Sequence, residues 1–278
     1  MKELIANITK NKKYKGIAKT ILEETITNYF TKHPKNKKYL KKVKTKKYKQ
    51  IISAIRSELH AIHGTFQNTK RGKREEYLDD LKKILKNKIE ERQILDTHKK
   101  LLATNRSTKE RQTSYPTLYQ TLFHHTGKPK SILDLGCGIN PISYPYIDLG
   151  KIKYYAYDID ESDMEFLNEY FKIMQLPGKA QTLDLKKIEN IKKLPKVDVA
   201  LLFNLLDSLE QGKGHKLSET IITTLKAKHL VISFATKTIS GKLMKHPNRG
   251  WIEQLLKRKK LSYETLVSEN ELFYVIKK

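Results

Sequence analysis

Apolar residues in the first third of the chain recur at helical spacing. Three sets stand out, within residues 17–30, 42–63 and 77–89, and each would form one apolar stripe along a helix. Such a stripe needs a packing partner, because an isolated helix of this length is only marginally stable in water. We therefore expect these helices to pack together as an N-terminal all-α domain, residues 1–104.

After about residue 128 the pattern changes to short apolar runs that alternate with helical stretches. This alternation predicts βαβ units and a mainly parallel sheet. The five runs are Ser131–Leu135, Lys153–Asp158, Lys179–Asp184, Val197–Phe203 and His229–Phe234. An antiparallel hairpin at the sheet edge is predicted by two later runs with a tight connection, Ser262–Val267 and Leu272–Ile276. Residues 105–278 are thus expected to form an α/β domain.

The chain is strongly basic. Its 278 residues hold 56 Lys and Arg against 30 Asp and Glu, a formal net charge of +26. The densest part, from Lys32 to Lys49, contains ten lysines and no acidic residue, with Tyr39 and Tyr48 among them. A solvated surface is one explanation for such a run, but a basic surface on a folded helix suits phosphate contact. We expect nucleic-acid binding.

Composition also excludes several classes of protein. No stretch approaches the roughly 20 apolar residues that span a bilayer, and the first residues lack the apolar run of a signal peptide. A single cysteine, Cys137, excludes an internal disulfide and a Cys-rich zinc site. The nine histidines do not cluster at metal-ligand spacing. We expect a soluble, cytoplasmic protein with no metal and no membrane contact.

A glycine-rich turn follows the first predicted strand, with the sequence S-I-L-D-L-G-C-G-I-N-P over residues 131–141. Glycines at such a turn let the backbone approach a ligand closely. Asp158 ends the next strand, where a carboxylate can accept hydrogen bonds from ribose hydroxyls. Pro141 occupies the third glycine position of the dinucleotide fingerprint, which disfavours NAD. S-adenosyl-L-methionine is the preferred cofactor, and a purely structural turn is the remaining alternative.

The D-L-G-C-G segment resembles motif I of class I methyltransferases, and the terminal hairpin resembles the reversed last strand of that Rossmann-like fold. By this resemblance, Asp184 at the end of the third strand faces the adenine amino group. Methyltransferases that act on exocyclic amines often have [DNS]-P-P-[YFW] after the fourth strand. Phe203 is followed here by Asn204-Leu205-Leu206, which argues against an adenine-N6 mechanism.

Segments from almost the whole chain resemble the aminoglycoside-resistance 16S rRNA methyltransferases, which modify a guanine N7 in the decoding site of the small ribosomal subunit. The S-T-K-E-R segment and the N-P after the glycine turn are the most specific of these matches. The similar segments are Lys12–Lys15, Leu59–Gly64, Ser107–Arg111, Leu133–Pro141, Ser233–Lys237 with Gly241, and Glu271–Lys278.

This resemblance implies S-adenosyl-L-methionine as cofactor and S-adenosyl-L-homocysteine as product. It assigns Arg111 to the cofactor's carboxylate, Asp158 to the ribose, and Asp184 with Leu185 to the adenine. Asn204 is a departure, because the family usually has lysine there. No catalytic acid or base is expected, since guanine N7 has a free lone pair. The expected cofactor-binding residues are Ser107, Thr108, Arg111, Gly136, Cys137, Gly138, Asp158, Asp184, Leu185, Phe203 and Asn204.

The resemblance also implies a monomer that acts on 16S rRNA within the assembled small subunit. The loop after residue 237 is shorter than in the family, and Asn248-Arg249 replaces its N-Y, so the target nucleotide is less specified than the cofactor. Methylation at another position such as adenine N1, a non-catalytic assembly factor, a general RNA chaperone and a housekeeping relative are the alternatives. The expected RNA-binding residues are Lys12, Lys13, Lys15, Lys41, Lys42, Lys237, Lys242, Asn248 and Arg249.

Overall fold

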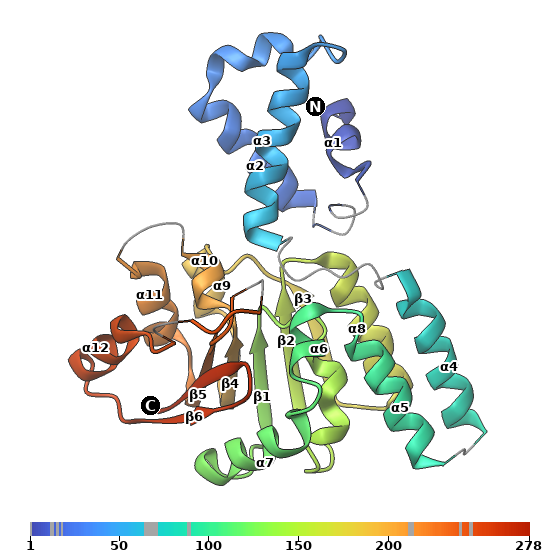
Figure 1. Cartoon of the computed structure of the whole chain (residues 1–278), viewed down its shortest axis with the longest axis vertical. Helices are drawn as coiled ribbons and strands as arrows, with labels where there is room; N and C mark the ends of the chain where they lie inside the picture. The colour runs from blue at the N-terminus through green and yellow to red at the C-terminus, as the bar shows by residue number, and fades with distance from the viewer. Residues whose placement is uncertain are drawn as a thin grey trace.

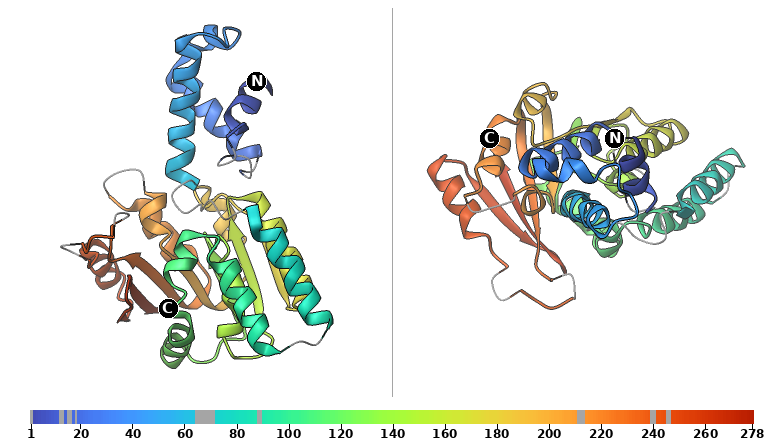
Figure 2. Two further views of the ribbon diagram at one scale, coloured as in Figure 1. Left: turned by 45° about the vertical axis from the view of Figure 1, so that its right-hand side comes forward. Right: turned by 90° about the horizontal axis from the view of Figure 1, so that it is seen from above.

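The structure is a computed structural model that consists of a helical body and an α/β body (Figure 1). The helical body lies over the carboxyl edge of the parallel strands, and the two further views agree on this placement (Figure 2). The structure describes residues 2–11, 14, 17, 19–63, 72–87, 90–210, 214–238, 241–244 and 247–278.

The helical body consists of α1 (Lys2–Thr9), α2 (Lys19–Lys32), the 3-10 helix η2 (Pro34–Tyr39) and α3 (Lys46–His63). Its own hydrophobic core confirms the first two predicted helical stripes. The core residues include Leu4, Ile8, Leu22, Ile26, Ile51, Ile55 and Leu59. Contact with the second body is made by Ile159, which packs against this core, and by an ion pair between Lys187 and Glu24.

The α/β body is built on one seven-stranded sheet with the order β3-β2-β1-β4-β5-β7-β6. Strands β1 to β5 are parallel, and β7 runs antiparallel to both β5 and β6. This confirms the predicted parallel sheet and terminal hairpin. The strands are β1 (Ser131–Leu135), β2 (Lys153–Asp158), β3 (Gly178–Thr182), β4 (Val197–Phe203), β5 (Ala227–Ala235), β6 (Tyr263–Val267) and β7 (Glu271–Lys277).

Helices cover both faces of the sheet (Figure 1). One face packs against α4 (Arg74–Lys86), α5 (Glu91–Leu102), α7 (Tyr115–Thr126), the 3-10 helix η5 (Asn140–Tyr146) and α8 (Glu161–Ile173). The other packs against α9 (Ile188–Lys192), α10 (Leu206–Leu209), α11 (Lys216–Thr224) and α12 (Gly250–Arg258). The short helix α6 (Arg106–Glu110) lies between α5 and α7 in the chain.

The third predicted helical stripe, now α4, packs on the α/β body and not on α2 and α3. Leu78 and Leu81 of α4 join Leu101 and Leu102 of α5 in the larger core, because α5, which itself packs on η5, provides the apolar surface that α4 needs. The two cores therefore divide the chain between His63 and Arg74, whereas the sequence predicted a division after residue 104.

Two absences apply to the part of the chain that the structure describes. No helix there is both long and apolar enough to cross a membrane. Within the same residues, no three His, Cys, Asp or Glu side chains gather in an arrangement that could hold a metal ion.

Candidate functional site

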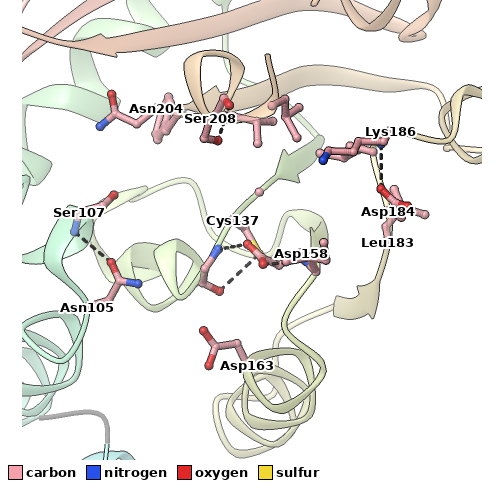
Figure 3. A pocket seen from close by; sticks show the side chains of 17 residues that line it. Asn105, Ser107, Cys137, Asp158, Asp163, Leu183, Asp184, Lys186, Asn204 and Ser208 are labelled. Atoms are coloured by element: carbon pink, nitrogen blue, oxygen red, sulfur yellow. Dashed lines mark hydrogen bonds between the residues drawn. The ribbon is translucent and has the colours of Figure 1, made fainter. Parts of the chain in front are cut away.

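A cleft opens at the carboxyl edge of the parallel strands (Figure 3), the edge over which the helical body lies in Figure 1. It lies where the strand order reverses between β1 and β4, which is the usual ligand position in open α/β sheets. The cleft encloses about 900 Å³, counting the solvent at its mouth. Its walls come from the start of α6, the loop after β1, the ends of β2 and β3, the first turn of α8, and the segment from β4 into α10.

The glycine turn after β1 forms the floor of the cleft. Gly136 and Gly138 have φ angles of +62° and +49°, a left-handed conformation that favours glycine. A Cβ atom on Gly136 would lie 2.4 Å from Cδ1 of Leu205 across the cleft. Asp158 holds the turn, because its Oδ2 accepts a hydrogen bond of 2.8 Å from the Gly138 N–H. Its Oδ1 accepts a second from the Ile159 N–H at 2.7 Å.

A buried polar network supports the turn from below. Asp134 on β1 accepts hydrogen bonds through Oδ2 from Asn140 at 2.9 Å and from the Tyr154 hydroxyl at 2.7 Å. Tyr115 in turn donates to Oδ1 of Asn140 at 2.7 Å. Burial raises the pKa of Asp134 to about 6, although the two donors act in the opposite direction. The asparagine of the N-P dipeptide therefore ties the turn to the sheet, a role that the sequence pattern did not indicate.

Arg111 lies behind the cleft wall and does not line the cleft itself. Its Nε donates to both carboxylate oxygens of Glu271, at 2.9 and 2.8 Å, and the guanidinium lies 4.9 Å from the centre of the Phe203 ring. Burial lowers the pKa of Arg111, but the Glu271 carboxylate outweighs this effect and raises the pKa above its ordinary value. Its Nη2 atom is buried and has no hydrogen-bond partner among the described residues.

Asn204 directly follows β4 and lines the cleft. It adopts a left-handed φ of +50°. Its amide Nδ2 donates to Glu271, so one carboxylate orients both Asn204 and Arg111. The Oδ1 atom of Asn204 is buried and, within the described part of the chain, accepts no hydrogen bond. The pair thus offers one unused donor and one unused acceptor beside the cleft.

These features fit a nucleoside that bears an amino acid. The left-handed glycine turn leaves a surface that a Cβ would fill, and the Asp158 carboxylate stands beside it. Asp184 and Leu185 follow β3 at the other end of the cleft, where Asp184 Oδ1 accepts the Lys186 N–H at 2.9 Å. Unused polar atoms of Arg111 and Asn204 suit a carboxylate and an ammonium group respectively.

Most of the predicted cofactor residues meet in this one cleft. Those that line it are Ser107, Gly136, Cys137, Gly138, Asp158, Asp184, Leu185, Phe203 and Asn204. Thr108 and Arg111 are buried behind it, and the Thr108 hydroxyl donates to the Leu102 carbonyl at 2.6 Å. The cofactor contacts of these residues stay predictions.

Sequence reasoning missed eight lining residues. Asn105 could have been found, because it precedes the S-T-K-E-R segment and caps α6 by accepting the Ser107 N–H at 3.0 Å. Four others are direct neighbours in the chain of predicted cleft residues, whereas Asp163, Ser208 and Leu209 reach the cleft from α8 and α10 with no sequence pattern of their own. The missed residues are Asn105, Ile159, Asp163, Leu183, Lys186, Leu205, Ser208 and Leu209.

The predicted RNA-binding residues divide between the two bodies. Lys41 and Lys42 are exposed on the helical body, as are the other eight lysines of the run from Lys32 to Lys49. Lys242 and Asn248 are exposed on the loop after β5, and Lys237 there is half-buried. Lys12, Lys13 and Lys15 lie outside the described residues.

Arg249 differs from the predicted RNA-binding lysines that the structure describes, since its charge is already paired. Its Nη2 lies 3.0 Å from Oδ2 of Asp207 on α10, and the side chain is only 14% exposed. The guanidinium also packs on the Phe234 ring, 5.2 Å from its centre. Arg249 therefore anchors the loop to α10, beside Ser208 of the cleft, and an RNA contact by this residue stays a prediction.

Comparisons with known proteins agree with this geometry. A family model described as ribosomal RNA methyltransferase (FmrO) matches residues 44–275. The 16S rRNA (guanine(1405)-N(7))-methyltransferase of Proteus mirabilis is 31% identical over 206 residues, which cover 70% of this chain and 71% of that protein. The protein of the same name from Serratia marcescens is 24% identical over 278 residues, covering 99% and 98%.

A solved structure also resembles the whole chain. The 16S rRNA methyltransferase RmtF in complex with S-adenosyl-L-homocysteine matches with a TM-score of 0.75 at 20% identity, covering 100% of this chain and 97% of RmtF. That likeness, with the reversed β7, confirms the predicted class I methyltransferase fold. Because the family model spans most of the sequence, the chain belongs to the ribosomal RNA methyltransferase (FmrO) family.

Proposed function

We propose that this protein transfers a methyl group from S-adenosyl-L-methionine to N7 of a guanine in the 16S rRNA of the small ribosomal subunit. The observation that supports this most is the cleft itself. It joins the left-handed glycine turn, Asp158 and Asp184 at the carboxyl edge of the sheet, in a chain of the rRNA methyltransferase family. The relatives named above act on that atom according to their names.

The cleft residues would hold the cofactor along its length. Asp158 would accept hydrogen bonds from the ribose hydroxyls, and Asp184 with Leu185 would face the adenine. Gly136 would lie against the methionine chain, and Phe203 would close the wall behind it. Arg111 would bind the carboxylate with the Nη2 that Glu271 leaves unused. When bound, S-adenosyl-L-methionine supplies an electrophilic methyl group on a sulfonium sulfur.

The acceptor chemistry determines what the cleft must supply. Guanine N7 has a lone pair and no proton, so its attack needs no general base. The protein's contribution is then to hold the guanine N7, the methyl carbon and the sulfur in line for the transfer. The target guanine must first leave the base stack, which costs a few kcal/mol.

Phosphate contacts from the helical body would offset that cost. All ten lysines between Lys32 and Lys49 are exposed, and this body lies over the edge where the cleft opens (Figure 2). Lys237 and Lys242 would add contacts from the loop after β5. We propose that the protein acts as a monomer on the assembled small subunit in the cytoplasm, and that the modification protects ribosomes from 4,6-linked aminoglycosides.

Two measurements test the proposal. Calorimetry with S-adenosyl-L-homocysteine should show binding, and incubation of purified small subunits with methyl-labelled cofactor should place label in N7-methylguanosine after digestion and mass spectrometry. Absence of cofactor binding would leave only a basic RNA-binding protein. Binding without transfer would favour a silent assembly factor, and label in N1-methyladenosine would identify a different target.

A further inference from the structure

A buried ion pair joins α4 to α8 beside the cofactor cleft. Arg74, only 5% exposed, places Nη1 2.5 Å from Oδ1 of Asp163, which is equally buried. The Nε of Arg74 donates to the Thr104 hydroxyl at 2.8 Å, and the guanidinium packs on the Phe166 ring, 5.9 Å from its centre. One side chain at the start of α4 therefore contacts two other segments of the α/β body, α8 and the residues just before α6.

Two of these contacts lead directly into the cleft. Asp163 is in the first turn of α8 and points into the cleft on the same side as Asp158 (Figure 3). Thr104 is followed by Asn105, which lines the cleft and caps α6 ahead of Ser107. Arg74 thus fixes the spacing between the α8 wall and the α6 wall of the cleft.

The charge of Arg74 is needed as well as its reach. Asp163 is a buried carboxylate in a cleft that already contains Asp158 and Asp184. Without a counter-charge, a buried carboxylate among other carboxylates is strongly unfavourable. Loss of Arg74 would therefore push the α8 wall away from its present position.

Arg74 also has a particular place in the chain. It is the first residue of α4, the first α-helix after α3 of the helical body. In Figure 1 α4 begins at the level where the two bodies meet, to the right of the lower end of α3. Arg74 thus begins the first α-helix of the α/β body.

We propose that Arg74 is a positioning residue for cofactor binding, which holds Asp163 and the Thr104–Asn105 segment at the spacing that the bound cofactor requires. The inference rests on the proposed function, since it takes the cleft as the cofactor site. S-adenosyl-L-methionine and S-adenosyl-L-homocysteine differ only at the sulfur that carries the methyl group, so replacing Arg74 should weaken the binding of both by the same factor.

Calorimetry with S-adenosyl-L-homocysteine tests the proposal on the full chain. Arg74→Met keeps most of the length of the side chain but removes the charge that pairs with Asp163, and it should weaken binding by about tenfold or more. Arg74→Lys keeps the charge but loses the fork of donors, so its affinity should lie between those of the wild type and Arg74→Met. The matched control is Leu78→Ala on the same helix, which removes core packing away from the cleft.

The control separates a loss of affinity from a loss of stability. Leu78→Ala should lower the melting temperature yet bind S-adenosyl-L-homocysteine within about twofold of the wild type. Equal affinity of Arg74→Met and wild type overturns the inference, as does an equal loss in Leu78→Ala. If Arg74→Met does not fold, Thr104→Val decides, because it keeps the ion pair and should weaken binding by about threefold; unchanged affinity overturns the inference. If the wild-type protein itself binds no S-adenosyl-L-homocysteine, that result would instead contradict the proposed function.

Discussion

Gly136→Ala tests the glycine turn, and Gly150→Ala is its matched control. Both glycines have a left-handed φ, +62° and +70°, so alanine at either position costs about 1 kcal/mol of backbone strain. Their surroundings differ. A Cβ on Gly136 would meet Leu205 Cδ1 at 2.4 Å, whereas a Cβ on Gly150 has nothing within 4 Å. The two variants thus share the strain and differ in the steric clash.

The clash sets the size of the expected effect. Carbon atoms pack at about 3.5–4.0 Å, so the glycine turn or Leu205 must move by more than about 1 Å, and both line the cleft. Overpacking of this kind costs about 1–3 kcal/mol. If the whole of that energy is lost from cofactor binding, Gly136→Ala should lower the affinity for S-adenosyl-L-homocysteine by about fivefold to 150-fold in calorimetry. Gly150→Ala should bind it with the affinity of the wild type. Equal affinities of the two variants would refute the reasoning.

Three further outcomes are expected. Because burial raises the pKa of Asp134 from 3.8 to about 6, the folded protein binds this proton more tightly and stability falls as pH rises through that window. Between pH 5 and pH 7 the free energy of unfolding in urea should fall by about 1 kcal/mol more in wild type than in Asp134→Asn; parallel curves would contradict this. Glu271→Gln leaves a buried guanidinium without its counter-charge and should cost about 3–5 kcal/mol in chemical denaturation. The control Glu264→Gln, at a carboxylate 65% exposed, should cost less than about 1 kcal/mol. The double variant Lys41→Gln/Lys42→Gln should reduce the salt dependence of small-subunit binding, by about 0.7–0.9 in the log–log slope for each phosphate that is no longer neutralised; an unchanged slope would remove these lysines from the interface.

Strands that are buried on both faces were predicted well from sequence. The bounds of β1, β2 and β4 agree with the predicted runs, because apolar residues fill each strand and polar or glycine residues end it. The third strand ends at Thr182, two residues before the predicted Asp184. Leu183 and Asp184 leave the sheet there to line the cleft, which no periodicity reveals.

Helix α5 was not predicted, since its buried face is partly polar. Thr97 and His98 point into the core alongside Leu101 and Leu102, which interrupts the apolar period. His98 is accommodated because its ring nitrogens contact the Ile94 carbonyl at 2.7 Å and the Tyr170 hydroxyl at 3.1 Å. Such pairings depend on α8, whose packing is decided by the tertiary fold.

In the candidate site, too, contacts that depend on tertiary packing could not be predicted from the sequence. Motif residues next to a strand end, such as Gly136 and Asp158, were predicted because their chemistry and spacing are local. Asp163 and Arg74 lie 89 positions apart in the sequence, and only the packing of α4 against α8 makes them a pair. The role of Glu271 likewise depends on β7 inserting beside β5.

The location of the methyl group tests the central claim most directly. Small subunits incubated with the wild-type protein and S-adenosyl-L-methionine should yield one 16S rRNA fragment from the decoding site, heavier by one methyl group and containing N7-methylguanosine in mass spectrometry. Fragments from incubations without the cofactor should lack it. A methyl group on another base, or none on 16S rRNA although the cofactor binds, would contradict the account.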